Sequence, residues 1–91
     1  MVIFMAEIKK KIWPEFFEQI QRGEKKFELR LADFDLKAGD VLVLEEFDPK
    51  TKKYTGRKIT KKCAKVFKLD ISKFYTPKQL QANGLYVIEL D

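Results

Sequence analysis

A short stretch, residues 23–30, joins the most regular predicted helix of the chain to a predicted strand in which charged and apolar residues alternate. It reads Gly23-Glu24-Lys25-Lys26-Phe27-Glu28-Leu29-Arg30. The pattern is G-x-K-x-x-E-x-R, and its glycine is the residue that most readily adopts the left-handed conformation that ends a helix. Because side chains alternate between two faces along a strand, Glu28 and Arg30 are expected to point the same way. The stretch therefore predicts a helix-to-strand boundary that brings Lys25, Glu28 and Arg30 together, either as a functional site or as a solvated strand face with a weak ion pair.

The residues before this stretch have the spacing of an amphipathic helix. Pro14 suits the first turn of a helix, where its missing N–H is not needed. Apolar side chains then recur at i, i+3, i+4 and i+7, and we expect all four in the core: Trp13, Phe16, Phe17 and Ile20. A helix is therefore predicted from Pro14 to the glycine at 23.

Strands are predicted to dominate the rest of the chain. They cover Ile8–Ile12, Lys25–Leu31, Val41–Asp48, a returning segment after the turn at 48–56, and Leu85–Leu90. The returning segment also fits helical spacing, but a strand there gives Val41–Asp48 its antiparallel partner. Thr76 and Gln79 have the spacing of a capping box and predict a second short helix. The order of these strands and helices predicts an α+β domain, namely a small bent β-barrel of about five strands with two short flanking helices.

Composition limits the classes of protein and of site. A chain of 91 residues fits a single domain, residues 1–91. It has one cysteine and no histidine, so an internal disulfide and the ordinary structural zinc sites are excluded, and no metal or cofactor is expected. The opening Met1–Met5 is too short for a signal-peptide core, and either methionine can start the chain. No run has the length of a membrane span, so we expect a cytoplasmic protein.

Basic residues are concentrated in one segment of the chain. Between Lys50 and Lys68 there are nine Lys or Arg and no acidic residue, whereas the remainder holds ten basic and fourteen acidic residues. Such segregation is typical of proteins that bind polyanions. The alternative is a lysine-rich hairpin that protects a sheet edge from aggregation.

Three motifs, in this order and spacing, resemble the ASCH domain, a branch of the PUA-like superfamily. They are the G-x-K-x-x-E-x-R stretch, Leu36-x-x-Gly39-Asp40-x-Leu42, and the hairpin from Glu46-Phe47-Asp48-Pro49 to Tyr54-Thr55-Gly56-Arg57. The resemblance spans residues 11–90 and is closest to a small uncharacterised group described as a domain of unknown function. It implies a PUA-like β-barrel with the motif residues on the floor of a cleft. The chain departs from that group at Ile8 and at Leu31-Ala32, where a histidine and a Lys-Asn pair are common.

The resemblance implies an RNA-related role, with RNA or a nucleotide as the partner. Arg30 can bind a phosphate or a base edge through two hydrogen bonds, and Glu28 can accept from an exocyclic amine. Tyr54 can stack an unpaired base, or it can serve only as a cross-strand packing partner. Lys25 and Arg57 complete the predicted ligand set. The predicted phosphate contacts are Lys52, Lys53, Lys58, Lys61, Lys62 and Lys65.

Enzymatic activity is the alternative. Some ASCH domains resemble amidohydrolases of acetylated cytidine, which use lysine, threonine and glutamate, and others are linked to ribonuclease activity. Lys25 matches the lysine of the amidohydrolase motif, but Glu28 stands where that motif has threonine. A binding module is therefore preferred to an enzyme that uses Lys25, and a protein-interaction domain is a further alternative. The sequence leaves the oligomeric state open.

Overall fold

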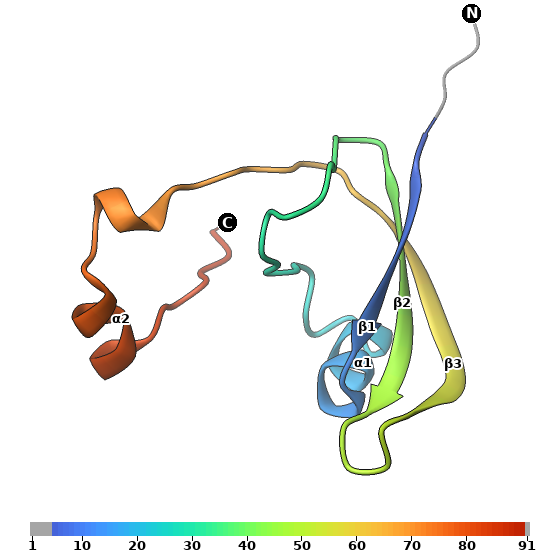
Figure 1. Ribbon diagram of the computed structural model, residues 1–91. Helices are drawn as coiled ribbons and strands as arrows, with labels where there is room; N and C mark the ends of the chain where they lie inside the picture. The colour runs from blue at the N-terminus through green and yellow to red at the C-terminus, as the bar shows by residue number, and fades with distance from the viewer. Residues whose placement is uncertain (1–4, 91) are drawn as a thin grey trace, which may run out of the picture.

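A three-stranded sheet with one helix packed against it forms the centre of the protein (Figure 1). The computed structural model describes residues 5–90, so nearly all of the Met1–Met5 opening lies outside the described residues. The strands are β1 (Glu7–Ile12), β2 (Val41–Asp48) and β3 (Lys53–Lys62). β1 runs parallel to β2, and β3 returns antiparallel to β2 after a tight turn. Their order in the sheet is β1-β2-β3, which leaves β1 and β3 at its edges.

The strands follow the pattern of their side chains. In β1, exposed residues alternate with less exposed ones, because only one face of this edge strand is covered. Leu42, Val43 and Leu44 of the central strand are all buried, since β2 has a neighbour on each side. The pairing of β2 with β3 shifts register between Glu45 and Phe47, and Gly56 has a φ of +93° at this irregularity. The predicted β1, β2 and returning strand are confirmed.

The predicted first helix is confirmed as α1 (Pro14–Gln21). It is followed by Gly23 at a φ of +77°, the left-handed conformation expected there. Phe17 and Ile20 are buried against the sheet, but Trp13 is 50% exposed and Phe16 40% exposed. The expectation that all four residues of the apolar stripe lie in the core is wrong for these two. A three-stranded sheet covers only part of a stripe this wide.

The core is small and lies between α1 and the sheet. Its buried members are Ile12, Phe17, Ile20, Leu42 and Leu44, with Ile8, Leu36, Ile59 and Cys63 packed around them. Leu36 belongs to the connection between α1 and β2, so this connection covers the same face of the sheet as α1.

Asp40 holds the end of that connection in place. The carboxylate is buried and accepts hydrogen bonds from the backbone N–H of Ala6 (3.1 Å) and of Lys37 (2.8 Å). Gly39, at a φ of +95°, donates its N–H to the carbonyl of Cys63 (2.7 Å). The predicted Gly-Asp turn therefore ties the starts of β1 and β2 to the end of β3.

The predicted five-stranded PUA-like barrel is wrong, because two of the five segments form no strand. Residues 25–31 and 85–90 lack ladder hydrogen bonds within the part of the chain described, and most of their apolar side chains are exposed. At the free edge of β1, the carbonyl of Lys11 accepts a hydrogen bond from the Arg30 side chain rather than from a neighbouring strand. An alternating or apolar pattern forms a strand only where its backbone pairs with a neighbouring strand, and here the Arg30 side chain occupies a carbonyl of the β1 edge. The sheet is therefore open.

The C-terminal third extends away from the sheet (Figure 1). It contains η1 (Ile71–Lys73), a short 3₁₀ turn that was not predicted, and α2 (Pro77–Asn83). The predicted capping box of Thr76 and Gln79 at the start of α2 is confirmed. None of the residues of α2 is buried. Within residues 5–90 no helix combines the length and the apolar character needed to cross a membrane.

Candidate functional site

An open cleft of about 420 Å³ lies where β1 ends and α1 begins. Its wall on one side is the N-terminal turn of α1, and on the other side it is the extended segment after Gly23. The lining residues are Lys11, Ile12, Trp13, Phe16, Lys25, Glu28, Leu29 and Arg30. The three charged residues of the G-x-K-x-x-E-x-R motif thus meet in one cleft.

Glu28 is the centre of the charged cluster. One of its carboxylate oxygens accepts a hydrogen bond from Lys25 Nζ at 2.8 Å, and the other accepts one from Arg30 Nε at 2.8 Å. The side chains of Lys25, Glu28 and Arg30 are only 16%, 16% and 28% exposed. Glu28 therefore holds both cations in fixed positions, and the cluster carries a net charge of about +1 at neutral pH.

Backbone contacts anchor this cluster at both ends. The N–H of Lys25 donates to the carbonyl of Gln19 at 3.1 Å, which joins the segment to the last turn of α1. Arg30 Nη2 donates to the carbonyl of Lys11 at 2.8 Å, which joins it to the free edge of β1. The segment is extended without being a strand, and these side-chain and cap contacts replace the ladder that was predicted.

Aromatic rings form the other wall of the cleft. The rings of Trp13 and Phe16 are stacked with centroids 6.4 Å apart and an angle of 24° between their planes. Lys25 Nζ lies 5.2 Å from the centroid of the Phe16 ring and 5.4 Å from that of Phe27. At these distances the ammonium is attracted by the ring faces as well as by Glu28. The cleft thus combines half-exposed flat rings with fixed positive charge.

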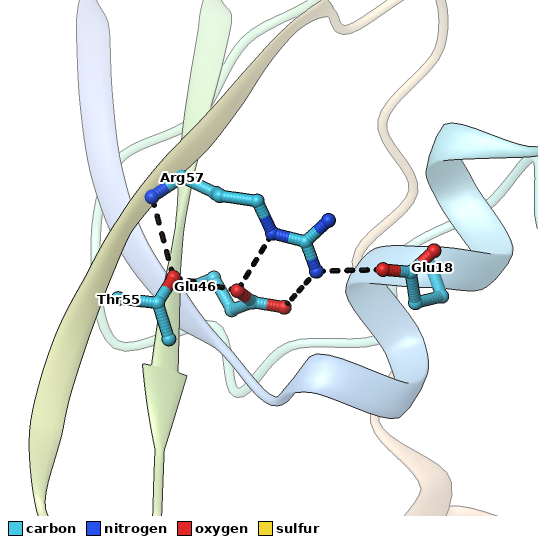
Figure 2. A network of polar contacts seen from close by, with 4 residues as sticks. All are labelled: Glu18, Glu46, Thr55 and Arg57. Atoms are coloured by element: carbon cyan, nitrogen blue, oxygen red, sulfur yellow. Dashed lines mark hydrogen bonds and ion pairs between the residues drawn. The ribbon is translucent and has the colours of Figure 1, made fainter.

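Arg57, predicted as a ligand contact, lies outside this cleft in a second polar network (Figure 2). Its Nε and Nη2 donate to the two oxygens of Glu46 at 2.9 and 2.7 Å, and Nη2 also donates to Glu18 at 2.6 Å. The hydroxyl of Thr55 donates to Glu46 as well. This network ties β2 and β3 to α1, so Arg57 has a structural role that the sequence did not indicate.

The environment of Glu46 fixes its charge state. Its side chain is 3% exposed, and the hydrogen bonds from Arg57, followed by that from Thr55, lower the pKa of the carboxyl although burial opposes this. The bonds to Glu46 and then to Glu18 raise the pKa of Arg57. The Arg57 guanidinium also lies 4.7 Å from the centroid of the buried Phe17 ring. Glu46 and Arg57 are therefore both charged in the folded protein.

Tyr54 lies opposite Phe47 across the β2–β3 pair. Their ring centroids are 5.3 Å apart in an edge-on arrangement, so the packing role considered for Tyr54 is present. The Tyr54 residue is nevertheless 53% exposed, which leaves the stacking role open. Neither ring lines the cleft.

The six lysines predicted to contact phosphates are all exposed but do not share one surface. Lys52 lies in the turn before β3 with a φ of 56°, and Lys65 lies beyond the end of β3. The other four are on β3, where the alternation of side chains divides them between two faces: Lys53, Lys58, Lys61 and Lys62.

Sequence reasoning missed the aromatic wall and Lys11. Trp13 and Phe16 were assigned to the core, although Trp13 precedes the helix and only Phe17 and Ile20 face the sheet. Lys11 is not among the predicted site residues, although it lines the cleft. In residues 5–90 no group of three or more His, Cys, Asp or Glu side chains is arranged to hold a metal ion.

A protein-family model matches most of the chain. The model of a family described as a domain of unknown function, DUF3850, matches residues 8–82, which include nearly all of β1, then α1, the motif segment, the β2–β3 hairpin and nearly all of α2. No curated protein matches the chain. Because the match covers well over half of the sequence and contains every residue of the cleft, this chain belongs to the DUF3850 family.

Proposed function

We propose that this domain binds RNA or a nucleotide in the cleft between α1 and the G-x-K-x-x-E-x-R segment. The observation that carries the proposal is the pairing of half-exposed aromatic rings with two fixed cations in one open cleft. A nucleotide has the matching parts, a flat base and an anionic phosphate. A cleft of about 420 Å³ lies within the range of small-ligand sites in proteins.

The cations have donors left for a phosphate. Arg30 uses Nε for Glu28 and Nη2 for the carbonyl of Lys11, and its Nη1 has no hydrogen-bond partner within residues 5–90. Lys25 gives one of its three ammonium hydrogens to Glu28. Because Glu28 already holds both groups in place, little side-chain entropy is lost when they bind an anion.

The rings of Trp13 and Phe16 suit an unpaired base. They project from the start of α1 with about half of their surface exposed, although burial would stabilise large apolar rings. Stacking of a base on an aromatic side chain contributes about 1–3 kcal/mol and tolerates any base, since every base has a π-face. The resemblance to ASCH domains supports the same partner.

The geometry favours binding over chemistry at Lys25. Its ammonium is paired with Glu28 at 2.8 Å, and a nucleophilic amine would have to give up this ion pair and lose its proton. In the binding role Lys25 acts as a positive charge, so arginine can replace it in part.

Titration of the ¹⁵N-labelled protein with uridine and cytidine monophosphates at low salt tests the proposal. We expect the largest shifts at the backbone amides around Trp13, Lys25 and Arg30. The variants Trp13→Ala and Arg30→Ala should each weaken binding at least fivefold, whereas Lys25→Arg should retain most of it.

Arg22→Ala is the matched control for Arg30→Ala. Arg22 lies next to the cleft segment, carries the same charge and forms an exposed ion pair with Glu24. If Arg22→Ala and Arg30→Ala lose the same affinity, the loss in Arg30→Ala is due to net charge alone. Shifts spread over the surface without a focus on the cleft would refute the site. Hydrolysis of acetylcytidine or cleavage of RNA that is lost in Lys25→Arg would replace the binding role with an enzymatic one.

A further inference from the structure

The face of the sheet that α1 does not cover carries a row of exposed lysines. The register places Lys9 of β1 beside Val43 and Thr60, and it places Lys11 beside Glu45 and Lys58. Lys62 lies at the end of the same face, beside Val41 and Glu7. Lysines from both edge strands therefore share one surface about 10 Å wide, the span of two strand spacings.

The burial pattern supports this assignment of faces. In β1 the exposed residues are Glu7, Lys9 and Lys11, while Ile8 and Ile12 are turned toward the core that α1 covers. In β3 only Ile59, on the α1 side, is half-buried, and the other residues are exposed. Within residues 5–90 the core elements that pack on the sheet, α1 and the connection containing Leu36, lie on the α1 side. The other side carries none of these elements, although Val43 at its centre is buried, and we refer to it as the open face.

Lys11 joins the open face to the cleft. Its Nζ lies 4.3 Å from the centroid of the Phe47 ring and 5.6 Å from that of Tyr54, two side chains of the open face. The same residue lines the cleft, and its carbonyl accepts the hydrogen bond from Arg30. A ligand that leaves the cleft past the edge of β1 thus meets Lys11 first and the aromatic pair next.

We propose that a single RNA strand runs from the cleft over Lys11 and across the open face. This inference rests on the proposed function of the cleft and adds the path of the strand. Lys9, Lys11, Lys58 and Lys62 contact phosphates along it, and an unpaired base stacks on the exposed part of Tyr54. The width of the face suits one extended strand, and the exposed Tyr54 ring favours a single strand over a duplex because a base can stack on it only when it is unpaired.

Charge complementarity argues for a polyanion as the occupant of this face. The open face carries four lysines and the two glutamates Glu7 and Glu45. Glu45 lies in register between Lys11 and Lys58, so its negative charge offsets part of the repulsion between the two lysines. An acidic protein surface would match the lysines but would leave the exposed aromatic ring without a flat partner.

A pair of matched double variants tests the path. Lys9→Gln with Lys58→Gln removes two charges from the open face. Lys53→Gln with Lys61→Gln removes two charges from the same hairpin, but these residues lie in register with Asp48 and Leu42 and so belong to the α1 side. The probe is a fluorescently labelled, uridine-rich single-stranded RNA, titrated at several salt concentrations, and circular dichroism confirms that each variant is folded.

The open-face double variant should reduce the magnitude of the log–log salt slope by about 1.4, because each phosphate contact with a single strand contributes about 0.7. The control pair should leave the slope unchanged. Tyr54→Leu keeps an apolar partner for Phe47 and should weaken RNA binding at least fivefold while leaving mononucleotide binding in the cleft unchanged.

The outcomes distinguish a failure of this inference from a failure of the proposed function. Equal losses in the two double variants would show that only net charge matters and would refute the path. RNA affinity that falls in Arg30→Ala but not in any open-face variant would also refute it and leave the cleft proposal standing. Absence of binding by both the RNA and the mononucleotides would refute the proposed function itself.

Discussion

Replacement of Glu28 by glutamine tests whether the charged cluster holds the motif segment in place. Residues 25–30 form no strand, and they are held mainly by the bonds of Glu28 to Lys25 and Arg30 and by that of Arg30 to Lys11. Glutamine keeps the size of the side chain but offers one neutral oxygen and one N–H₂ group. The amide nitrogen would then face one of the two cations, and that hydrogen bond would be lost.

The size of the effect follows from the burial of the cluster. Exposed ion pairs contribute about 0–1 kcal/mol, whereas a hydrogen bond to a charged group in a protected site contributes about 1.5–3 kcal/mol. The Glu28 side chain is 16% exposed and its partners 16% and 28%, which places the cluster between these limits. We expect Glu28→Gln to lower the free energy of unfolding by about 1–2 kcal/mol. In a domain of this size each kcal/mol corresponds to a fall in Tm of about 4–8 °C.

Urea unfolding followed by circular dichroism measures this free energy, with Glu24→Gln as the control. Glu24 belongs to the same segment and pairs with Arg22 at 3.2 Å, but the two side chains are 61% and 57% exposed. The control should change the free energy by less than about 0.5 kcal/mol. If Glu28→Gln is no more destabilising than Glu24→Gln, the charged cluster does not hold residues 25–30 in place against α1 and β1.

Three further predictions concern other parts of the chain. Phe17→Ala should lower the free energy of unfolding, measured in urea, by about 3–5 kcal/mol, because Phe17 is fully buried in a small core. Phe74→Ala, at an exposed ring, should have little effect, and equal losses in the two variants would contradict the assigned core. Arg57 and Thr55 lower the pKa of Glu46 in the folded protein, so the ionised Glu46 stabilises the fold above the unfolded pKa of 4.5, and this stabilisation is lost as the pH falls through the lower folded pKa. Glu46→Gln should therefore flatten this part of the acid-unfolding curve, and an unchanged curve would exclude Glu46 as the source of the pH dependence. Burial, followed by the charge of Asp40, raises the pKa of the Cys63 thiol, so iodoacetamide should alkylate Cys63 at pH 8 more slowly in the folded protein than in urea, and equal rates would argue against the burial of this thiol.

Local patterns in the sequence determined where the helices begin and end and which charged side chains of the motif lie together. Pro14 and Gly23 bracket α1 because one fits the first turn of a helix and the other tolerates the left-handed conformation after it. The capping box of Thr76 and Gln79 starts α2 in the same local manner. The spacing of Lys25, Glu28 and Arg30 predicted that these side chains gather, and it did so correctly even though the segment is not a strand, because extended backbone suffices to turn Glu28 and Arg30 the same way.

Only the tertiary structure decided which strands pair and which apolar side chains become buried. Residues 25–31 and 85–90 have suitable strand patterns, but a strand also requires backbone hydrogen bonds to a partner strand, and which segments pair is not encoded locally. The aromatic wall depends on the same kind of information, since the narrow sheet covers Phe17 and Ile20 but not Trp13 or Phe16. Arg57 looked like one more cation of a basic hairpin, and its structural role appeared only because the fold brings it against Glu46 of β2 and Glu18 of α1. Side-chain chemistry is local, whereas burial and partnership depend on segments that are distant in the chain.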